Sequence, residues 1–409
     1  MSLRLDTSLL TSFTLARKDS HQSDLTDTSF TSFSTSSDSL SSYSTSPSSC
    51  DVSCVSTPID EDFKCLSLPT SNQDALIPLF CTPCGVDLPR ESPETPHVEC
   101  LEPKMLPITK GINEWIKART ADWDRPLKVV GLLATTDEGC AIYSNQTRKA
   151  CEKVNVGFEI RTLEHDFEIV KSAIEQVNHD YEVDGLIIYF PLFGPDKDNE
   201  LRALISPRID IEAISPSSLA KVYTSTPGTL AEMGIGFPSH SVFPCTPLAV
   251  VRVLQSLKTM YDHLRPSGQR LSGKVISVIN RSETVGRPLA AMLANEGALI
   301  FSIDIDSIHI YHRHSAADHY CVTPLPKTVE TNDCLRLSDV VVSAVPSAKY
   351  KVDTAVLKTG CVCVNIATDN NFAEDVKDRA GVWVQRVGSV TIANLISNAV
   401  ILRLASECA

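Results

Sequence analysis

The segment LSGKVISVINRSETVGRP, residues 271–288, joins an apolar run to a turn that could hold a phosphate. Its run KVISVI (274–279) is rich in β-branched residues, which predicts a strand buried on both faces of a parallel sheet. Gly286 permits a tight turn, and Pro288 is preset for the first turn of a helix that Gly297 ends. Unpaired backbone N–H groups and the helix dipole favour an anion at such a helix start. We call residues 280–288 the cradle and interpret them as a phosphate site.

The cradle by itself is a weak signal of dinucleotide binding. The usual three glycines are reduced to Gly286, with Asn280 and Ser282 where the others could stand. A plain strand–helix unit without a ligand explains the stretch equally well. Other segments must therefore decide between the two interpretations.

Strands and helices alternate along the chain, which predicts right-handed βαβ units and parallel sheets with ligands beyond the strands' carboxyl ends. The predicted strands are 128–135, 157–164, 185–192, 274–279, 298–304, 339–345, 360–367 and 382–384. The predicted helices include 113–118, 139–154, 166–178, 289–296, one that opens at Cys245-Thr246-Pro247, and a long closing helix at 390–404.

Composition bounds the class of protein. The chain has 409 residues, 43% of them hydrophobic, a net charge of −13 and 14 cysteines that do not form a secreted-domain framework. The negative net charge argues against nucleic-acid partners. We expect that the thiols are reduced, that no stretch spans a membrane and that the protein is cytoplasmic. A transit peptide in the first 18 residues is the weaker alternative, because Asp6 stands there and no Arg-rich helix does. Residues 20–57 are more than half Ser and Thr, so we expect residues 1–99 to be a disordered tail.

Several segments, in order, give the chain a resemblance to a known family. The cradle string NRSETVGRP and five further segments resemble motifs of the methylenetetrahydrofolate dehydrogenase/cyclohydrolase family: YSNQTRKA (143–150), DGLIIYFPL (184–192), IDIEAI (209–214), FPCTPLAVV (243–251) and VGSVTIANL (387–395). The departures from the motifs resemble the family's monofunctional NAD-dependent branch of fungi. The resemblance implies an α/β protein of two lobes, a βαβ folate lobe at 100–246, closed by the helix at 390–405, and a Rossmann-like NAD domain at 247–389.

The resemblance also implies that a reduced folate lies between the lobes. Tyr143 would stack on it, and Glu212 would accept hydrogen bonds from the amino and ring N–H groups of the pterin. Tyr189, Pro191 and Thr391 would line the same cleft. Simpler interpretations remain open: Tyr143 as a core tyrosine, Tyr189 as a strand aromatic, and Glu212 as a solvated loop charge, because the family usually has Asp followed by Gly there.

The position of the family's catalytic lysine holds a threonine in this chain. Bifunctional members use that lysine for the cyclohydrolase step, and Thr147 stands in its place. Arg148 and Lys149 follow at about 100° and about 200° around the helix, so neither replaces it. A threonine hydroxyl does not carry protons near neutral pH, whereas hydride transfer needs no such group. We therefore expect Thr147 to mark a dehydrogenase without cyclohydrolase activity.

The choice of cofactor depends on the end of the strand that follows the cradle helix. Asp304 stands where a carboxylate would accept from the ribose hydroxyls of NAD and repel the 2′-phosphate of NADP, although it could be a plain surface acid. Arg281 argues the other way, because relatives that use NADP can reach the 2′-phosphate from that position. The remaining predicted cofactor residues are Ser282, Val285, Gly286, Ala344, Val345 and Ala367.

The stretch 305–335 holds His309, His312, His314, His319 and Cys321, but their spacing fits no zinc pattern, so we expect a solvated insertion and no metal. The predicted function is oxidation of 5,10-methylenetetrahydrofolate with NAD, in one-carbon metabolism and purine biosynthesis, by a homodimer. The alternatives are a bifunctional NADP-dependent dehydrogenase/cyclohydrolase and a catalytically silent folate- or nucleotide-binding regulator.

Overall fold

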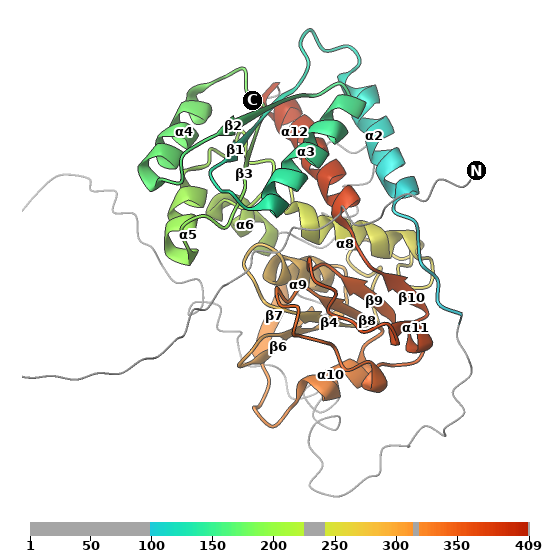
Figure 1. Ribbon diagram of the computed structural model, residues 1–409. Helices are drawn as coiled ribbons and strands as arrows, with labels where there is room; N and C mark the ends of the chain where they lie inside the picture. The colour runs from blue at the N-terminus through green and yellow to red at the C-terminus, as the bar shows by residue number, and fades with distance from the viewer. Residues whose placement is uncertain (1–98, 225–241, 314–318, 408–409) are drawn as a thin grey trace, which may run out of the picture. The chain divides into compact units, whose positions relative to one another are not determined.

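The computed structural model describes residues 99–224, 242–313 and 319–407 (Figure 1). The predicted tail, apart from its last residue, and His314 lie outside these ranges. Within them the chain builds two sheets, one of three strands and one of seven. The predicted α/β class is confirmed.

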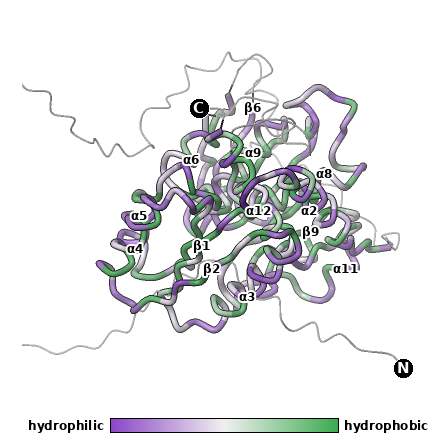
Figure 2. Tube along the Cα trace, turned by 90° about the horizontal axis from the view of Figure 1, so that it is seen from above, coloured by the Kyte–Doolittle hydropathy of each residue, from purple (hydrophilic) through white to green (hydrophobic). Residues whose placement is uncertain are grey.

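The first sheet has the order β2-β1-β3, with both pairs parallel. Its strands are β1 (Lys128–Leu133), β2 (Gly157–Thr162) and β3 (Gly185–Ile188). The crossover helices between them are α3 (Glu138–Lys153) and α4 (Phe167–His179), and each begins at an aspartate that accepts a backbone N–H of the first turn. Figure 2 colours β1 largely as hydrophobic and shows more hydrophilic residues on α4 and α5. The βαβ pattern predicted for this lobe is confirmed.

The second sheet has the order β10-β9-β8-β4-β5-β6-β7. Five strands are parallel: β4 (Val275–Ile279), β5 (Leu299–Ile303), β8 (Val340–Ser343), β9 (Val362–Asn365) and β10 (Val382–Val384). Two more are antiparallel, β6 (Ile308–Arg313) and β7 (Tyr320–Pro324). The expectation of a solvated insertion at 305–335 is therefore wrong for β6, because Ile308, Ile310 and Tyr311 are buried, whereas Val322 of β7 is exposed.

The remaining described helices connect or cover the strands. They are α2 (Leu106–Thr120), α5 (Pro195–Leu204), α6 (Pro216–Tyr223), α8 (Cys245–Ser256), α9 (Gly286–Asn295), α10 (Thr331–Leu337), the 3-10 turn η1 (Thr354–Val356) and α11 (Val376–Arg379). Helix α9 ends as predicted, because Gly297 adopts a left-handed φ of 93° just beyond it.

The closing helix α12 (Gly388–Glu407) is long and apolar enough to cross a membrane, contrary to our expectation of no such stretch. Its residues from Val390 to Val400 are buried in the protein, which accounts for the apolar surface. Asn394 donates to the Cys245 carbonyl at 3.1 Å, and Asn398 donates to the Ile211 carbonyl at 2.8 Å. The helix thus fixes two loops that reach the candidate site.

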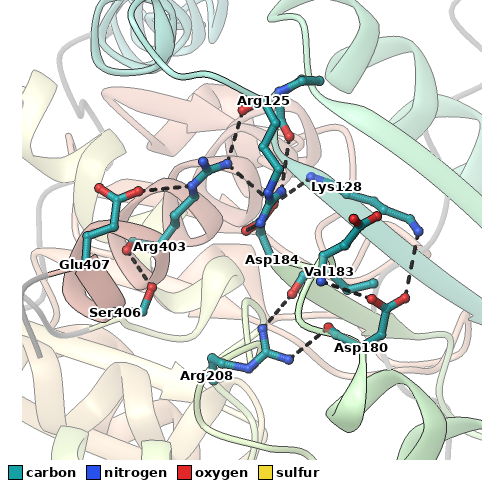
Figure 3. A network of polar contacts seen from close by, with 11 residues as sticks. Arg125, Lys128, Asp180, Val183, Asp184, Arg208, Arg403, Ser406 and Glu407 are labelled. Atoms are coloured by element: carbon teal, nitrogen blue, oxygen red, sulfur yellow. Dashed lines mark hydrogen bonds and ion pairs between the residues drawn. The ribbon is translucent and has the colours of Figure 1, made fainter.

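A charged network fixes the other end of α12 (Figure 3). Arg125 forms a bidentate pair with Asp184 at 2.7 and 2.9 Å, and Asp184 also accepts the backbone N–H of Lys128 at 2.9 Å. Arg403 of α12 donates to the Arg125 carbonyl at 3.2 Å and lies 4.3 Å from the Trp123 ring centroid. Because Asp184 is buried, these contacts are screened little and tie α12 to the start of β1 and β3.

Candidate active site

A pocket lies where the first sheet, α12 and the cradle meet. It receives side chains from α3, from the loops after β3, from α5 and from the turn before α8. The cradle and α12 complete it. Its lining residues are Tyr143, Ile188, Phe190, Arg202, Glu212, Ile214, Pro244, Cys245, Thr246, Thr284, Val285, Thr391 and Leu395. Four predicted site residues, Tyr143, Glu212, Val285 and Thr391, are therefore brought together.

Contacts between α6 and the cradle hold this arrangement. The Tyr223 hydroxyl donates to the Glu283 carboxylate at 3.4 Å. Arg287 pairs with the same carboxylate at 2.7 Å, and its guanidinium lies 5.0 Å from the Tyr223 ring centroid. The cradle is thus attached to the lobe that carries Tyr143 and Glu212.

Tyr143 presents an aromatic wall to the pocket. Its side chain is 4% exposed, and its ring meets the Tyr189 ring edge to face, with centroids 6.2 Å apart and planes at 74°. Burial raises the pKa of the Tyr143 hydroxyl well above its usual value. The hydroxyl therefore stays protonated at physiological pH and cannot act as a base.

Thr147, Tyr189 and Pro191 do not line the pocket. Thr147 is fully buried and donates to the Tyr143 carbonyl at 3.0 Å, which is a local helix contact. Tyr189 is fully buried with its ring against that of Tyr143, so the structure favours the interpretation of a strand aromatic. Pro191 is exposed, and its neighbour Phe190 supplies the lining side chain instead. Substrate contact by Tyr189 and Pro191 stays a prediction that the lining of the pocket does not support.

The space for the Tyr189 ring comes from Gly131 of β1. A Cβ at Gly131 would stand 3.1 Å from the Cε2 atom of Tyr189 and 3.2 Å from its hydroxyl oxygen. Such distances are tighter than ordinary van der Waals contact, so any larger residue at 131 would push the ring away. Gly131 is a supporting residue that carries no motif and that sequence reasoning missed.

Glu212 lines the pocket from a tightly bonded turn. Asp210 accepts backbone N–H groups of Ile214 and Ser215 at 3.2 and 3.0 Å, and it therefore shapes the turn around Glu212. Ala213 adopts a left-handed φ of 55°, a conformation that glycine adopts without strain. The backbone N–H of Ile188 donates to the Glu212 carboxylate at 3.2 Å.

The environment of Glu212 disfavours its charge. Burial raises the pKa of the Glu212 carboxyl to about 8, and the charge of Asp210 adds to the rise. The Ile188 N–H and the Arg202 guanidinium act in the opposite direction. Without a ligand the group is therefore mostly protonated at neutral pH, whereas N–H donors of a bound molecule would favour the ionised form. The solvated-charge interpretation of Glu212 does not fit this position.

Arg202 is the lining residue that sequence reasoning missed. Its guanidinium carbon lies 5.0 Å from the Phe190 ring centroid, and its Nη1 donates to Asn199 at 2.6 Å. Its Nε is buried, and among the described residues it has no hydrogen-bond partner. Burial lowers the pKa of Arg202, while the charges of Asp198 and Glu212 oppose that effect. The hydrophilic sequence around it, DKDNELR, gives no signal of a pocket residue.

The cradle has the geometry that a phosphate site requires. A Cβ at Gly286 would stand 1.8 Å from the Asn280 carbonyl oxygen, so only glycine fits this close approach. Asn280 itself adopts a left-handed φ of 83°, which asparagine tolerates, and its side chain donates to the Ala344 carbonyl at 2.7 Å. The Gly286 N–H donates to the Ser282 hydroxyl at 3.3 Å. The departure from glycine at 280 therefore preserves the turn.

The other predicted cofactor residues gather at the carboxyl edge of the same sheet. Ala344 and Val345 follow β8, Ala367 follows β9, and the half-buried Asp304 follows β5. These strands run parallel to β4, so their ends meet beside the cradle. A dinucleotide fits this donor set: small residues permit close approach, and a carboxylate can accept from ribose hydroxyls.

Ligand-type side chains form no metal-binding cluster of three or more in the described ranges. His309, His312 and Cys321 lie on β6 and β7 of the sheet. The absence of a metal therefore stays a prediction.

The sequence matches two family models. Residues 105–212 match the catalytic domain of tetrahydrofolate dehydrogenase/cyclohydrolase, and residues 244–406 match its NAD(P)-binding domain. A methylenetetrahydrofolate dehydrogenase [NAD(+)] of Saccharomyces cerevisiae is 38% identical over 295 residues, 71% of this chain and 89% of the relative. One of Schizosaccharomyces pombe is 35% identical over 280 residues, 68% of this chain and 85% of the relative.

A solved structure agrees with these matches. The NAD-dependent 5,10-methylenetetrahydrofolate dehydrogenase from Saccharomyces cerevisiae superposes with a TM-score of 0.69 at 32% identity. The match covers 77% of this chain and 99% of that one.

Proposed function

The chain belongs to the tetrahydrofolate dehydrogenase/cyclohydrolase family, and on that premise we propose that its pocket oxidises 5,10-methylenetetrahydrofolate to 5,10-methenyltetrahydrofolate with NAD. The protein is an NAD-dependent methylenetetrahydrofolate dehydrogenase, as are relatives that are 35–38% identical to it. The observation that carries the proposal is the shared pocket. Tyr143 and Glu212, from the folate lobe, line it together with Thr284 and Val285 of the cradle.

Hydride transfer requires that the folate site and the cofactor site share one pocket. The donor and acceptor carbons must approach to about 3–3.5 Å in a fixed orientation, which only a pocket common to both ligands can provide. NAD, when bound, supplies the carbon that accepts the hydride. The N5–CH2–N10 bridge loses a hydride and leaves a cation that the adjacent nitrogen lone pairs stabilise, so no proton carrier is needed.

The described side chains then have distinct tasks. The Tyr143 face stacks on the folate, and the Glu212 carboxylate accepts from the pterin's N–H donors. Ile188, Phe190 and Leu395 provide apolar walls that exclude water from the reacting atoms. The ionised Glu212 also favours the positive charge that develops on the product.

The absence of cyclohydrolase activity is part of the proposal. Hydration of the methenyl bridge needs a general acid or base close to the folate. Thr147, at the family's lysine position, is fully buried with its hydroxyl bonded to the helix backbone. Thr147 is not among the residues that line the pocket, and a threonine hydroxyl does not carry protons near neutral pH, which supports a monofunctional enzyme.

The purified full-length chain, mixed with methylenetetrahydrofolate and NAD, should reduce the cofactor, which is followed by its ultraviolet absorbance. Binding of both ligands without turnover would favour the silent regulator. Hydrolysis of methenyltetrahydrofolate well above the rate in buffer would favour the bifunctional enzyme.

A further inference from the structure

The guanidinium of Arg281 is committed to the turn between β5 and β6. Its Nε donates to the Ser302 hydroxyl at 3.0 Å, and its Nη1 donates to the Ser307 hydroxyl at 3.0 Å. Its Nη2 donates to the carbonyls of Ser302 at 2.6 Å and Ser307 at 3.0 Å. A guanidinium has five N–H donors, so at least four of them are directed at these two serines.

This turn carries Asp304. The Asp304 N–H donates to the Ser307 carbonyl at 2.9 Å, and the Asp304 carboxylate accepts the N–H of Ile305 at 2.9 Å. Arg281 therefore joins both ends of the turn, Ser302 in β5 and Ser307 before β6. The turn is tight because it joins two antiparallel strands, β5 and β6, in which Ile303 pairs with Ile308.

We propose that Arg281 is a positioning residue for cofactor selectivity: it clamps the 304–307 turn and fixes the Asp304 carboxylate toward the ribose, instead of binding a 2′-phosphate. This inference rests on the NAD-dependent function proposed above. A 2′-phosphate would need donors from Arg281 that the serines already occupy, and it would meet the negative charge of Asp304. Arg281, whose position in the sequence argued for NADP, thus supports NAD here.

The geometry explains why a lysine at 281 cannot contact both Ser302 and Ser307 as the arginine does. An ammonium group is a point charge with three donors, whereas the planar fork of a guanidinium spans two residues at once. Arg281→Lys keeps the charge near the cofactor but loses the double contact with Ser302 and Ser307. Ser307→Ala removes one acceptor from the clamp and changes no charge.

The test measures dissociation constants of NAD and of NADP, each without folate, by calorimetric titration of the full chain. Ser307→Ala should lower the preference for NAD over NADP by about fivefold and Arg281→Lys by about tenfold, because each lost hydrogen bond is worth that order. In the double variant the preference for NAD over NADP should be no lower than in Arg281→Lys, since both changes act on one contact. Arg336→Ala is the control, an exposed arginine that pairs with Asp333 at 3.3 Å on α10.

If Arg281 had a purely structural role, its variants would have a lower melting temperature and would bind NAD and NADP more weakly by the same factor. Such an equal effect, or a selective loss of NADP binding in Arg281→Lys, would overturn the inference, the latter by showing direct phosphate contact. Failure of the unmodified chain to bind NAD would instead overturn the proposed function. Tight NAD binding with a preference unchanged in both variants would refute the clamp alone.

Discussion

Replacing Glu212 with glutamine should make the stability of the unliganded protein less dependent on pH. The folded-state pKa of Glu212 is raised to about 8, above its ordinary value of 4.5, so the folded protein binds this proton more tightly than the unfolded chain. The stability from this group is therefore complete below about pH 4.5 and is lost as the pH rises through about 8. The difference in pKa corresponds to about 5 kcal/mol between the two limits, since one pKa unit is worth about 1.4 kcal/mol.

Urea unfolding of the unliganded chain across this pH window measures the effect. The free energy of unfolding of Glu212→Gln, minus that of the unmodified protein, should increase by up to about 5 kcal/mol from acid to alkaline pH. Glu168→Gln, which changes an exposed glutamate at the start of α4, is the matched control and should show a constant difference. A constant difference for Glu212→Gln as well would mean that water reaches its carboxylate freely, and the argument from burial would be refuted.

The same change predicts how folate binding responds to pH. Pterin N–H donors favour the ionised carboxylate, so the unmodified protein should bind its substrate more tightly as the pH rises through about 8. Glu212→Gln should bind at least tenfold more weakly at alkaline pH, because hydrogen bonds to a charged acceptor are worth about 1.5–3 kcal/mol, and its affinity should not follow the pH. An unmodified protein whose affinity does not change with pH would separate Glu212 from the pterin.

Three further predictions follow from single residues. Asp304→Ser should narrow the preference for NAD over NADP in kcat/KM, because a like-charge contact costs several kcal/mol; equal use of both cofactors by the unmodified protein would contradict the role of Asp304. Thr147→Lys should lower the melting temperature, since its position is fully buried, and should leave methenyltetrahydrofolate hydrolysis at the buffer rate. Ala213→Gly should raise the free energy of unfolding in urea by about 0.5–1 kcal/mol, because alanine is strained at a φ of 55°; a loss of stability would show that this strain is negligible.

The regular parts of the fold were predictable because local patterns and tertiary structure agree. Runs of β-branched residues indicated the parallel strands. Gly286 stands where no Cβ fits, and Gly297 stands where the backbone takes a left-handed conformation. The strands β6 and β7 were missed because the histidines of 305–335 were interpreted as a polar insertion. The sequence IHIYHR does alternate, with Ile308 and Ile310 buried and His309 between them half-buried, which is a strand pattern.

The candidate site was predictable only where a motif carried it. Tyr143, Glu212 and Thr391 belong to motifs and meet in the pocket. Arg202 belongs to none, and it reaches the pocket because α5 places it over Phe190, a contact that no local pattern encodes. The domain boundaries, the cytoplasmic location and the homodimer stay predictions.

The loss of the family's lysine is best understood together with its neighbours. Thr147 is fully buried, the Tyr189 ring packs edge to face against Tyr143, and Gly131 leaves room for the Tyr189 ring. A lysine at 147 would have to displace that ring or bury its own charge. Either change costs more free energy than one new hydrogen bond contributes. We therefore expect that a change at 147 alone does not give hydrolysis of methenyltetrahydrofolate. The Thr147 side chain and Gly131 both adjoin Tyr189, so we expect that a variant with a lysine at 147 that reaches the pocket must change Tyr189 as well.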